Sequence, residues 1–230
     1  KAVGWPPERT PNAAPGLRVQ AFASGLEHPR TLLSLPNGDV LVTETNAPQR
    51  PVAQKGLRGW VMNKMMNYAG AGVPSANRIT LLRDADGDGV AELQTPFLEN
   101  LNSPFGMALV GDRLYVANTD AILRFPYRTG AIRIDAEGEK IADLPAGPRN
   151  HHWTKDLIAS PDGRTLYATV GSNSNVAEFG MAEEKNRAAI LAIDIASGST
   201  RLFASGLRNP NGLAWQPDSG ELWVAGNERD

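Results

Sequence analysis

The chain alternates short apolar segments with turns rich in Pro, Asp and Gly, and this pattern starts at about Leu17. Apolar segments bounded by such turn residues predict β-strands. The same order repeats four times: a polar loop, a short apolar strand, a turn and a second apolar strand. The turn residues supply the positive and preset φ angles that tight hairpins need. The four copies occupy residues 25–44, 102–117, 150–170 and 206–225.

Further apolar segments lie between the copies, so that each period contains about four strands. Periods of roughly 50 to 75 residues are typical of the blades of a β-propeller. We therefore predict an all-β fold, a β-propeller of four-stranded antiparallel blades, with about four blades present. The loops that lead into the innermost strands of a propeller converge on one face, which we call the mouth. The repeat places His152, Arg208 and Asn209 at this mouth.

The chain divides into a terminal arm and one large domain. Residues 1–16 are rich in Pro and polar residues, which indicates an extended N-terminal arm, and residues 17–230 form the propeller domain. The stretch 46–76 breaks the repeat and is expected to be an insertion with a helical turn over residues 61–68. We expect its large apolar side chains to pack against the core, and the alternative is that they contact the substrate; they are Trp60, Met62, Met65, Met66 and Tyr68.

Both ends of the chain look cut, because it begins at Lys1 without a leader and stops directly after a strong strand. We therefore expect a partial chain that lacks C-terminal blades. The composition excludes several other classes of protein. A net charge of −2 gives no basic excess for a nucleic-acid partner. There is no cysteine, so disulfides and thiolate metal sites are excluded. No apolar run approaches the roughly 20 residues that span a bilayer.

The stretch from Gly147 to Leu157 holds two of the three histidines, His151 and His152, directly before a predicted strand. Histidine is suited to general-base chemistry, because its ordinary pKa lies close to neutral pH. The alternative is that one ring caps the strand and the other lies in solvent. A zinc site is disfavoured because adjacent histidines cannot easily bind one ion together. A serine hydrolase is disfavoured because the sequence has no G-x-S-x-G motif.

The segment 84–92 is the most specific local motif. Its carboxylates and glycines can bring several oxygen atoms to one hard cation, which predicts a structural calcium site. The alternative is a solvated acidic hairpin. The expected ligands are Asp84, Asp86, Asp88, Glu92 and the carbonyl oxygen of Val90.

The segment 206–214 places Arg208 beside Asn209 at the start of the fourth copy. An arginine there is suited to binding carboxylates and to stabilising a developing oxyanion. The alternative is an arginine that ties adjacent blades together.

Taken together, the motifs at 150–155, 160–163, 170–173, 206–210 and 227–230 resemble the glucose/sorbosone dehydrogenase family. These quinoproteins use pyrroloquinoline quinone (PQQ) on a six-bladed propeller and include L-sorbosone dehydrogenase-like members. The resemblance implies a quinoprotein that oxidises a sugar or aldehyde by hydride transfer to PQQ, with calcium as a second cofactor. It implies that His152 is the base and that Arg208 meets the quinone oxygen. Asn209 then binds the cofactor, and the loop at Glu228 and Arg229 binds its calcium.

One departure concerns Ser172, which stands where glucose dehydrogenases of this family carry an Asp. The Lys and Arg residues that hold the PQQ carboxylates belong to later blades. The resemblance also implies an external electron acceptor and a periplasmic or secreted bacterial location, and it leaves a homodimer open. Two other functions stay open at this point: a calcium-dependent lactonase, and a propeller that binds carbohydrate or protein without catalysis.

Overall fold

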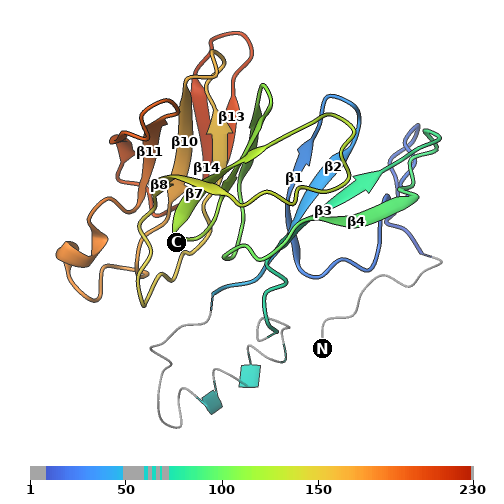
Figure 1. Ribbon diagram of the computed structural model, residues 1–230. Coiled ribbons are helices and arrows are strands. Elements are labelled where there is room, and N and C mark those ends of the chain that lie inside the picture. The colour runs from blue at the N-terminus through green and yellow to red at the C-terminus, as the bar shows by residue number, and fades with distance from the viewer. Residues whose placement is uncertain (1–8, 49–59, 62–63, 66–67, 69–72, 229–230) are drawn as a thin grey trace.

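A computed structural model describes residues 9–48, 60, 61, 64, 65, 68 and 73–228. In these residues the fold is built from antiparallel sheets that stand side by side (Figure 1). Blade 1 contains β1 (Pro29–Ser34), β2 (Val40–Glu44), β3 (Arg78–Arg83) and β4 (Leu93–Leu98). Blade 2 contains β5 (Met107–Val110), β6 (Arg113–Ala117), β7 (Ala121–Pro126) and β8 (Glu139–Asp143).

Blade 3 contains β9 (Leu157–Ala159), β10 (Thr165–Val170), β11 (Ala189–Asp194) and β12 (Thr200–Ser205). A short 3₁₀ helix, η1 (Met181–Glu184), lies between β10 and β11. Blade 4 contains two described strands, β13 (Asn209–Trp215) and β14 (Leu222–Asn227). In every blade the strands follow their sequence order, as in a meander.

The first strands of successive blades contact one another: β1 contacts β5, β5 contacts β9, and β9 contacts β13. This arrangement of inner strands around an axis is that of a β-propeller, so the predicted fold class is confirmed. All four copies of the sequence repeat form the first two strands of a blade.

The core consists of two layers of apolar side chains between adjacent blades. β6 shows how one strand serves both layers, because successive side chains of a strand point to opposite faces. Leu114 and Val116 pack with blade 1, whereas Tyr115 and Ala117 pack with blade 3. A strand covered on both faces must be apolar at consecutive positions, which explains the unbroken Leu114–Ala117 run.

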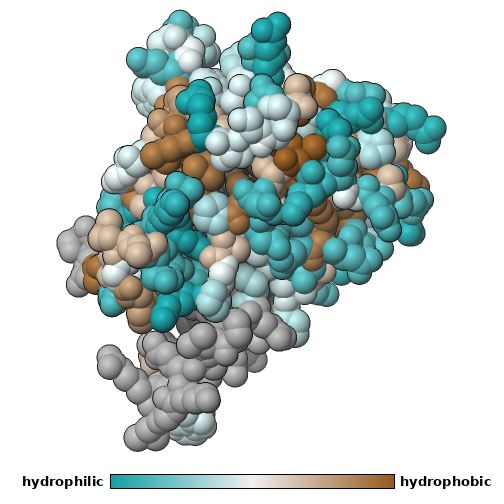
Figure 2. Space-filling view, turned by 60° about the vertical axis from the view of Figure 1, so that its left-hand side comes forward, coloured by the Kyte–Doolittle hydropathy of each residue, from teal (hydrophilic) through white to brown (hydrophobic). Residues whose placement is uncertain are grey.

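Hydrogen bonds and ring contacts join blade 4 to blade 3. The indole Nε1 of Trp215 donates to the carbonyl oxygen of Ala159 at 2.7 Å. The ring of Tyr167 meets the ring of Trp215 edge to face across the two blades, with centroids 5.6 Å apart. The Tyr167 ring also meets the Phe203 ring within blade 3, with centroids 4.8 Å apart. Figure 2 shows apolar patches between hydrophilic loops on this side of the molecule, and Trp223 of β14 is 62% exposed.

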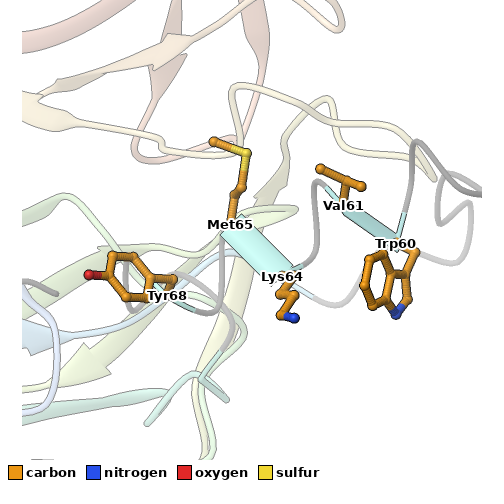
Figure 3. Close-up of a pocket in the computed structure, with 5 residues that line it drawn as sticks. All are labelled: Trp60, Val61, Lys64, Met65 and Tyr68. Atoms are coloured by element: carbon orange, nitrogen blue, oxygen red, sulfur yellow. The ribbon is translucent and has the colours of Figure 1, made fainter.

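The expectation that the insertion packs against the core is wrong for the side chains that the structure describes. Trp60, Met65 and Tyr68 are each at least 60% exposed. Together with Val61 and Lys64 they line a pocket, and Figure 3 shows short helical pieces carrying some of these side chains. The layers between blades are filled mainly by strand residues instead. Met62 and Met66 lie outside the described residues.

The N-terminal arm is described only from residue 9 onward. Described residues 9–16 are exposed and contain neither helix nor strand, while Trp5 lies outside the described residues. The arm and the domain limits stay predictions. In the described part of the chain, no helix has the length and apolar character needed to cross a membrane.

Candidate functional site

His152 lies in the turn before β9, half-buried, with its ring held by one residue of the neighbouring loop. Its Nδ1 atom is 2.9 Å from the carbonyl oxygen of Ser172 and 2.9 Å from the hydroxyl of the same residue. The Ser172 hydroxyl donates its own proton to the carbonyl oxygen of Ser174 at 2.7 Å. Both Ser172 oxygens therefore act as acceptors, and the hydrogen-bond network assigns the ring proton to Nδ1. The neutral ring then has its lone pair on Nε2 and can accept a proton there.

The charge state of His152 follows from its surroundings. Burial lowers the pKa of His152 from its ordinary value of 6.5, and the positive charges of Arg208 and His151 lower it further. The Ser172 carbonyl and Glu184 act in the opposite direction on this pKa but do not outweigh the burial. His152 is therefore mainly neutral at pH 7, as a general base must be.

Gly171 separates His152 from Asn209. A Cβ atom at position 171 would lie 2.4 Å from the His152 Cβ and 2.6 Å from the Asn209 Oδ1. Because real Cβ contacts are never this short, only glycine allows the histidine and the asparagine to flank the end of β10 so closely. The structure therefore brings His152 and Asn209 together.

The side-chain oxygen of Asn209 is buried and has no hydrogen-bond partner among the described residues. A buried acceptor without a donor costs free energy, so such groups often mark a site where a ligand or an ordered water binds. Asn209 Oδ1 thus offers a hydrogen-bond acceptor to a bound molecule.

Arg208 joins blades 3 and 4 and also presents its guanidinium beside the same loop. Its carbonyl oxygen accepts a hydrogen bond from the Ser172 N–H at 2.8 Å. Its Nη2 and Nε atoms donate to the side-chain and main-chain oxygens of Asn175 at 2.9 and 3.2 Å. A longer contact of 3.5 Å joins Nη1 to the Asn227 carbonyl oxygen. Arg208 therefore does join the two blades, and the same contacts hold its guanidinium near His152.

The calcium-binding loop inferred from the resemblance is described only in part. The carboxylate of Glu228 accepts a hydrogen bond from the Arg208 N–H at 3.1 Å. This contact places Glu228 next to the Arg208–Asn209 pair. Arg229 lies outside the described residues.

The predicted acidic loop forms a compact cluster. Carboxylate oxygens of Asp84, Asp86, Asp88 and Glu92 all lie within 4.8 Å of one another. Each also accepts a backbone N–H of the loop, and Asp84 accepts two, from Gly87 at 2.7 Å and Gly89 at 2.8 Å. Carboxylates that converge in this way can hold a hard cation such as calcium. The role of the Val90 carbonyl stays a prediction.

This acidic loop lies far from the mouth. It follows Arg83, which pairs with Asp39 at the start of β2, whereas the mouth end of blade 1 is marked by Glu44 at the end of β2. A cation bound by the loop would therefore stabilise the β3–β4 hairpin and would not touch His152.

Two charged residues that closely follow His152 in the chain, the fully buried Lys155 and the half-buried Asp156, were not singled out from the sequence. Lys155 is fully buried, and burial together with the charge of Arg187 lowers its pKa to about 7. Its Nζ donates to the Trp153 carbonyl oxygen at 3.3 Å. Burial raises the pKa of Asp156, whose carboxylate accepts the Leu213 N–H of blade 4 at 2.9 Å. The only sequence signal was a charged pair directly before the apolar strand.

A family model described as TrAA12-like matches residues 72–230. Similar solved structures include the PQQ domain of pyranose dehydrogenase from Coprinopsis cinerea in its holo form (TM-score 0.71, 19% identity, 95% of this chain, 48% of that chain). A calcium structure of the family AA12 enzyme from Trichoderma reesei is equally similar (TM-score 0.71, 18% identity, 96% and 51%). A candidate gluconolactonase is less similar (TM-score 0.53, 16% identity, 92% and 60%).

At these identities the structural matches show the shared propeller fold alone. The chain spans about half the length of the first two structures. No curated protein matches the sequence. The family match covers most of the chain, including the residues His152, Ser172, Arg208 and Asn209. The resemblance to PQQ-dependent sugar dehydrogenases is thereby confirmed, and the chain belongs to the TrAA12-like family.

Proposed function

We propose that this chain carries the base and one side of the cofactor site of a PQQ-dependent dehydrogenase that oxidises a sugar or an aldehyde. The single observation that carries the proposal is the His152–Ser172 contact. It leaves a neutral imidazole with its lone pair on Nε2, beside a buried asparagine and an arginine.

The residues at the mouth fit the cofactor that the family implies. Asn209 offers a buried acceptor without a partner among the described residues, and Gly171 allows this asparagine to lie close to His152. Asn209 and Arg208 would hold PQQ, and Glu228 lies where the resemblance places its calcium. PQQ supplies a quinone that accepts a hydride from the substrate carbon while the hydroxyl proton goes to the protein.

His152 would take that proton at Nε2 and become an imidazolium. The positive charge of the imidazolium is shared with Nδ1–H, which donates to the two oxygens of Ser172. A hydrogen bond to a carbonyl strengthens when the donor becomes charged, so Ser172 stabilises the product of proton transfer more than the neutral ring. The Arg208 guanidinium would stabilise negative charge on an oxygen atom of a bound molecule beside it.

The choice between an aldose and a sorbosone-type aldehyde, the external electron acceptor and the homodimer stay predictions. The periplasmic or secreted location also stays a prediction. Calcium is proposed in two places, at the mouth and in the 84–92 loop, where its role would be structural.

The lactonase alternative would need carboxylates that converge at the mouth. The one acidic cluster found among the described residues lies at the other end of blade 1. Glu184, the carboxylate packed behind Ser172, is occupied by backbone N–H groups. Among the described residues, no observation at the mouth therefore favours a lactonase over a dehydrogenase.

The proposal is tested by adding PQQ and calcium to the protein. Binding is measured by quenching of tryptophan fluorescence, and turnover by reduction of an artificial dye with a panel of aldoses and aldehydes. We expect calcium-dependent PQQ binding and dye reduction with at least one substrate. Absence of both binding and turnover would overturn the dehydrogenase proposal, and hydrolysis of a sugar lactone without PQQ would favour the alternative.

A further inference from the structure

A short segment behind the mouth, residues 181–187, contacts both pieces of chain that surround His152. It contains η1 and the turn that leads into β11. The two residues that make these contacts are Glu184, which is half-buried, and Arg187, which is 7% exposed. Neither residue touches His152 through a hydrogen bond that the structure shows, so both act through intermediate groups.

Glu184 holds the loop that follows β10. Its Oε2 atom accepts the Asn173 N–H at 2.7 Å, and its Oε1 atom accepts the N–H and the hydroxyl of Ser174 at 3.1 and 3.0 Å. These three hydrogen bonds are accepted by a charged carboxylate, so each is stronger than a hydrogen bond between neutral groups. Their effect is to fix the orientation of the Ser174 main chain.

The orientation of Ser174 controls the hydrogen bond to His152. The Ser174 carbonyl oxygen accepts the Ser172 hydroxyl proton, and this contact turns the lone pairs of that hydroxyl toward His152 Nδ1. If Ser174 turned away, the Ser172 hydroxyl could rotate and donate to the ring nitrogen instead. The Ser172 carbonyl oxygen would then be the single remaining acceptor for Nδ1–H, so the tautomer would shift toward Nε2–H, which places the proton on the atom that must be free of one in a base.

Arg187 binds the second piece of chain beside His152, which is the turn that carries both histidines. Its Nη1 donates to the side-chain oxygen of Asn150 at 3.1 Å, and its Nη2 donates to the carbonyl oxygen of Ala146. Asn150 is 3% exposed and has a φ of 37°, an unusual angle for a residue other than glycine. Its N–H donates to the side chain of Asn173 at 3.1 Å, so the two held pieces of chain are also bonded to each other.

We infer that Glu184 and Arg187 are positioning residues that select the Nδ1–H tautomer of His152. The significance of this selection for catalysis rests on the proposed function, but the selection itself does not require a cofactor. It is a property of the hydrogen-bond network between residues 146–152, 172–174 and 184–187.

The test uses the whole chain without PQQ, with ¹⁵N-labelled histidine. The ¹⁵N chemical shifts of the imidazole nitrogens report the tautomer, and the signals of His152 are assigned with His152→Gln. In the unaltered protein we expect the Nδ1–H form to exceed the Nε2–H form by about fivefold or more, the factor that one hydrogen bond supplies. A ratio near unity, or an excess of Nε2–H, would overturn the inference.

Two variants and one control locate the cause. Glu184→Ala removes all three hydrogen bonds and is expected to shift the His152 tautomer toward Nε2–H. Glu184→Gln keeps the size of the side chain but loses the charge and one acceptor oxygen, and is expected to give an intermediate ratio. Glu183→Gln, at the exposed neighbour, is expected to leave the ratio unchanged. Native folding of each variant is checked by circular dichroism, and Glu184→Gln decides the result if the alanine variant does not fold.

The outcomes separate this inference from the proposed function. An unchanged tautomer in the folded Glu184 variants would overturn the positioning role even if the protein turns over sugars with PQQ. A changed tautomer together with absent PQQ binding would support the positioning role and contradict the proposed function. Where turnover is present, a positioning role further predicts a lower kcat with little change in KM for Glu184→Gln.

Discussion

The Nδ1 atom of His152 is 2.9 Å from the carbonyl oxygen of Ser172 and equally close to the hydroxyl of the same residue. Glucose dehydrogenases of the resembling family carry an Asp at this position. A serine supplies two neutral acceptors instead of a negative charge, so the residue at this position orients the ring without adding a carboxylate that would raise its pKa.

The first prediction concerns this exchange of serine for aspartate. Ser172→Asp places a negative charge beside the ring and should raise the pKa of His152 by roughly one unit or more. Ser172→Ala keeps the carbonyl acceptor and should change this pKa much less. An NMR titration of the histidine signals measures both values. A lower pKa in Ser172→Asp would contradict the contact.

The second prediction concerns Gly171. Gly171→Ala forces a Cβ atom against His152 and Asn209 and should lower the free energy of unfolding by about 1–3 kcal/mol, as overpacking does. Gly226→Ala is a matched control, because a Cβ there meets its nearest atoms at 3.7 and 3.9 Å. Denaturant titration compares the two variants. Equal effects at both positions would show that the close approach at 171 is not real.

The third prediction concerns the pH dependence of stability. Lys155 has a pKa of about 7 in the folded protein against 10.5 when exposed, so the unfolded chain binds more protons between these values. The free energy of unfolding should therefore rise with pH between about 7 and 10.5. Below about pH 7 Lys155 is charged in both states, so its contribution to the free energy of unfolding does not change with pH.

Lys155→Met should remove this dependence. The stability difference between the protein and Lys155→Met should change in favour of the unaltered protein by several kcal/mol from pH 7 to 10.5. The difference is obtained from denaturant titrations at each pH, with Lys185→Met at an exposed position as the control. A difference that stays flat with pH would mean that Lys155 keeps its charge when folded.

The fourth prediction concerns the acidic loop. Calcium should bind it and raise the Tm, and replacing both Asp84 and Asp86 by Asn should abolish this rise, because two converging ligands lose their charge. Thermal melts with calcium and with a chelator measure the effect. Asp218→Asn, at an exposed turn, serves as the control. If millimolar calcium leaves the Tm of the unaltered protein unchanged, the loop is a solvated hairpin.

The fold was predictable because each blade begins with a local sequence signal, two apolar strands joined by a turn. The turn residues between apolar strands, such as Pro161, Asp162 and Gly163, fix the hairpins, and the repeat of these hairpins fixes the propeller. Equivalent positions in a repeat converge on one face, so the sequence alone predicts that His152 and Asn209 lie at the same mouth.

Other features depend on contacts that the sequence does not encode locally. In the sequence, a serine at position 172 in place of the family's Asp suggests that the base has lost its partner. Only the geometry shows that both oxygens of Ser172 lie close to Nδ1 of His152. Lys155 reads as a loop residue, although its neighbours bury it completely. Trp60 and Met65 read as core residues, because apolar character indicates a tendency to be buried but does not identify the surface that covers them.

The most direct test of the central claim is turnover by His152→Gln in the presence of PQQ and calcium. His151→Gln is the matched control, because it changes the adjacent histidine. We expect His152→Gln to bind PQQ as the unaltered protein does and to lose dye-linked oxidation by at least about 10²-fold, the usual contribution of a general base. His151→Gln should keep most of this activity. Undiminished turnover in His152→Gln would show that this histidine is not the base.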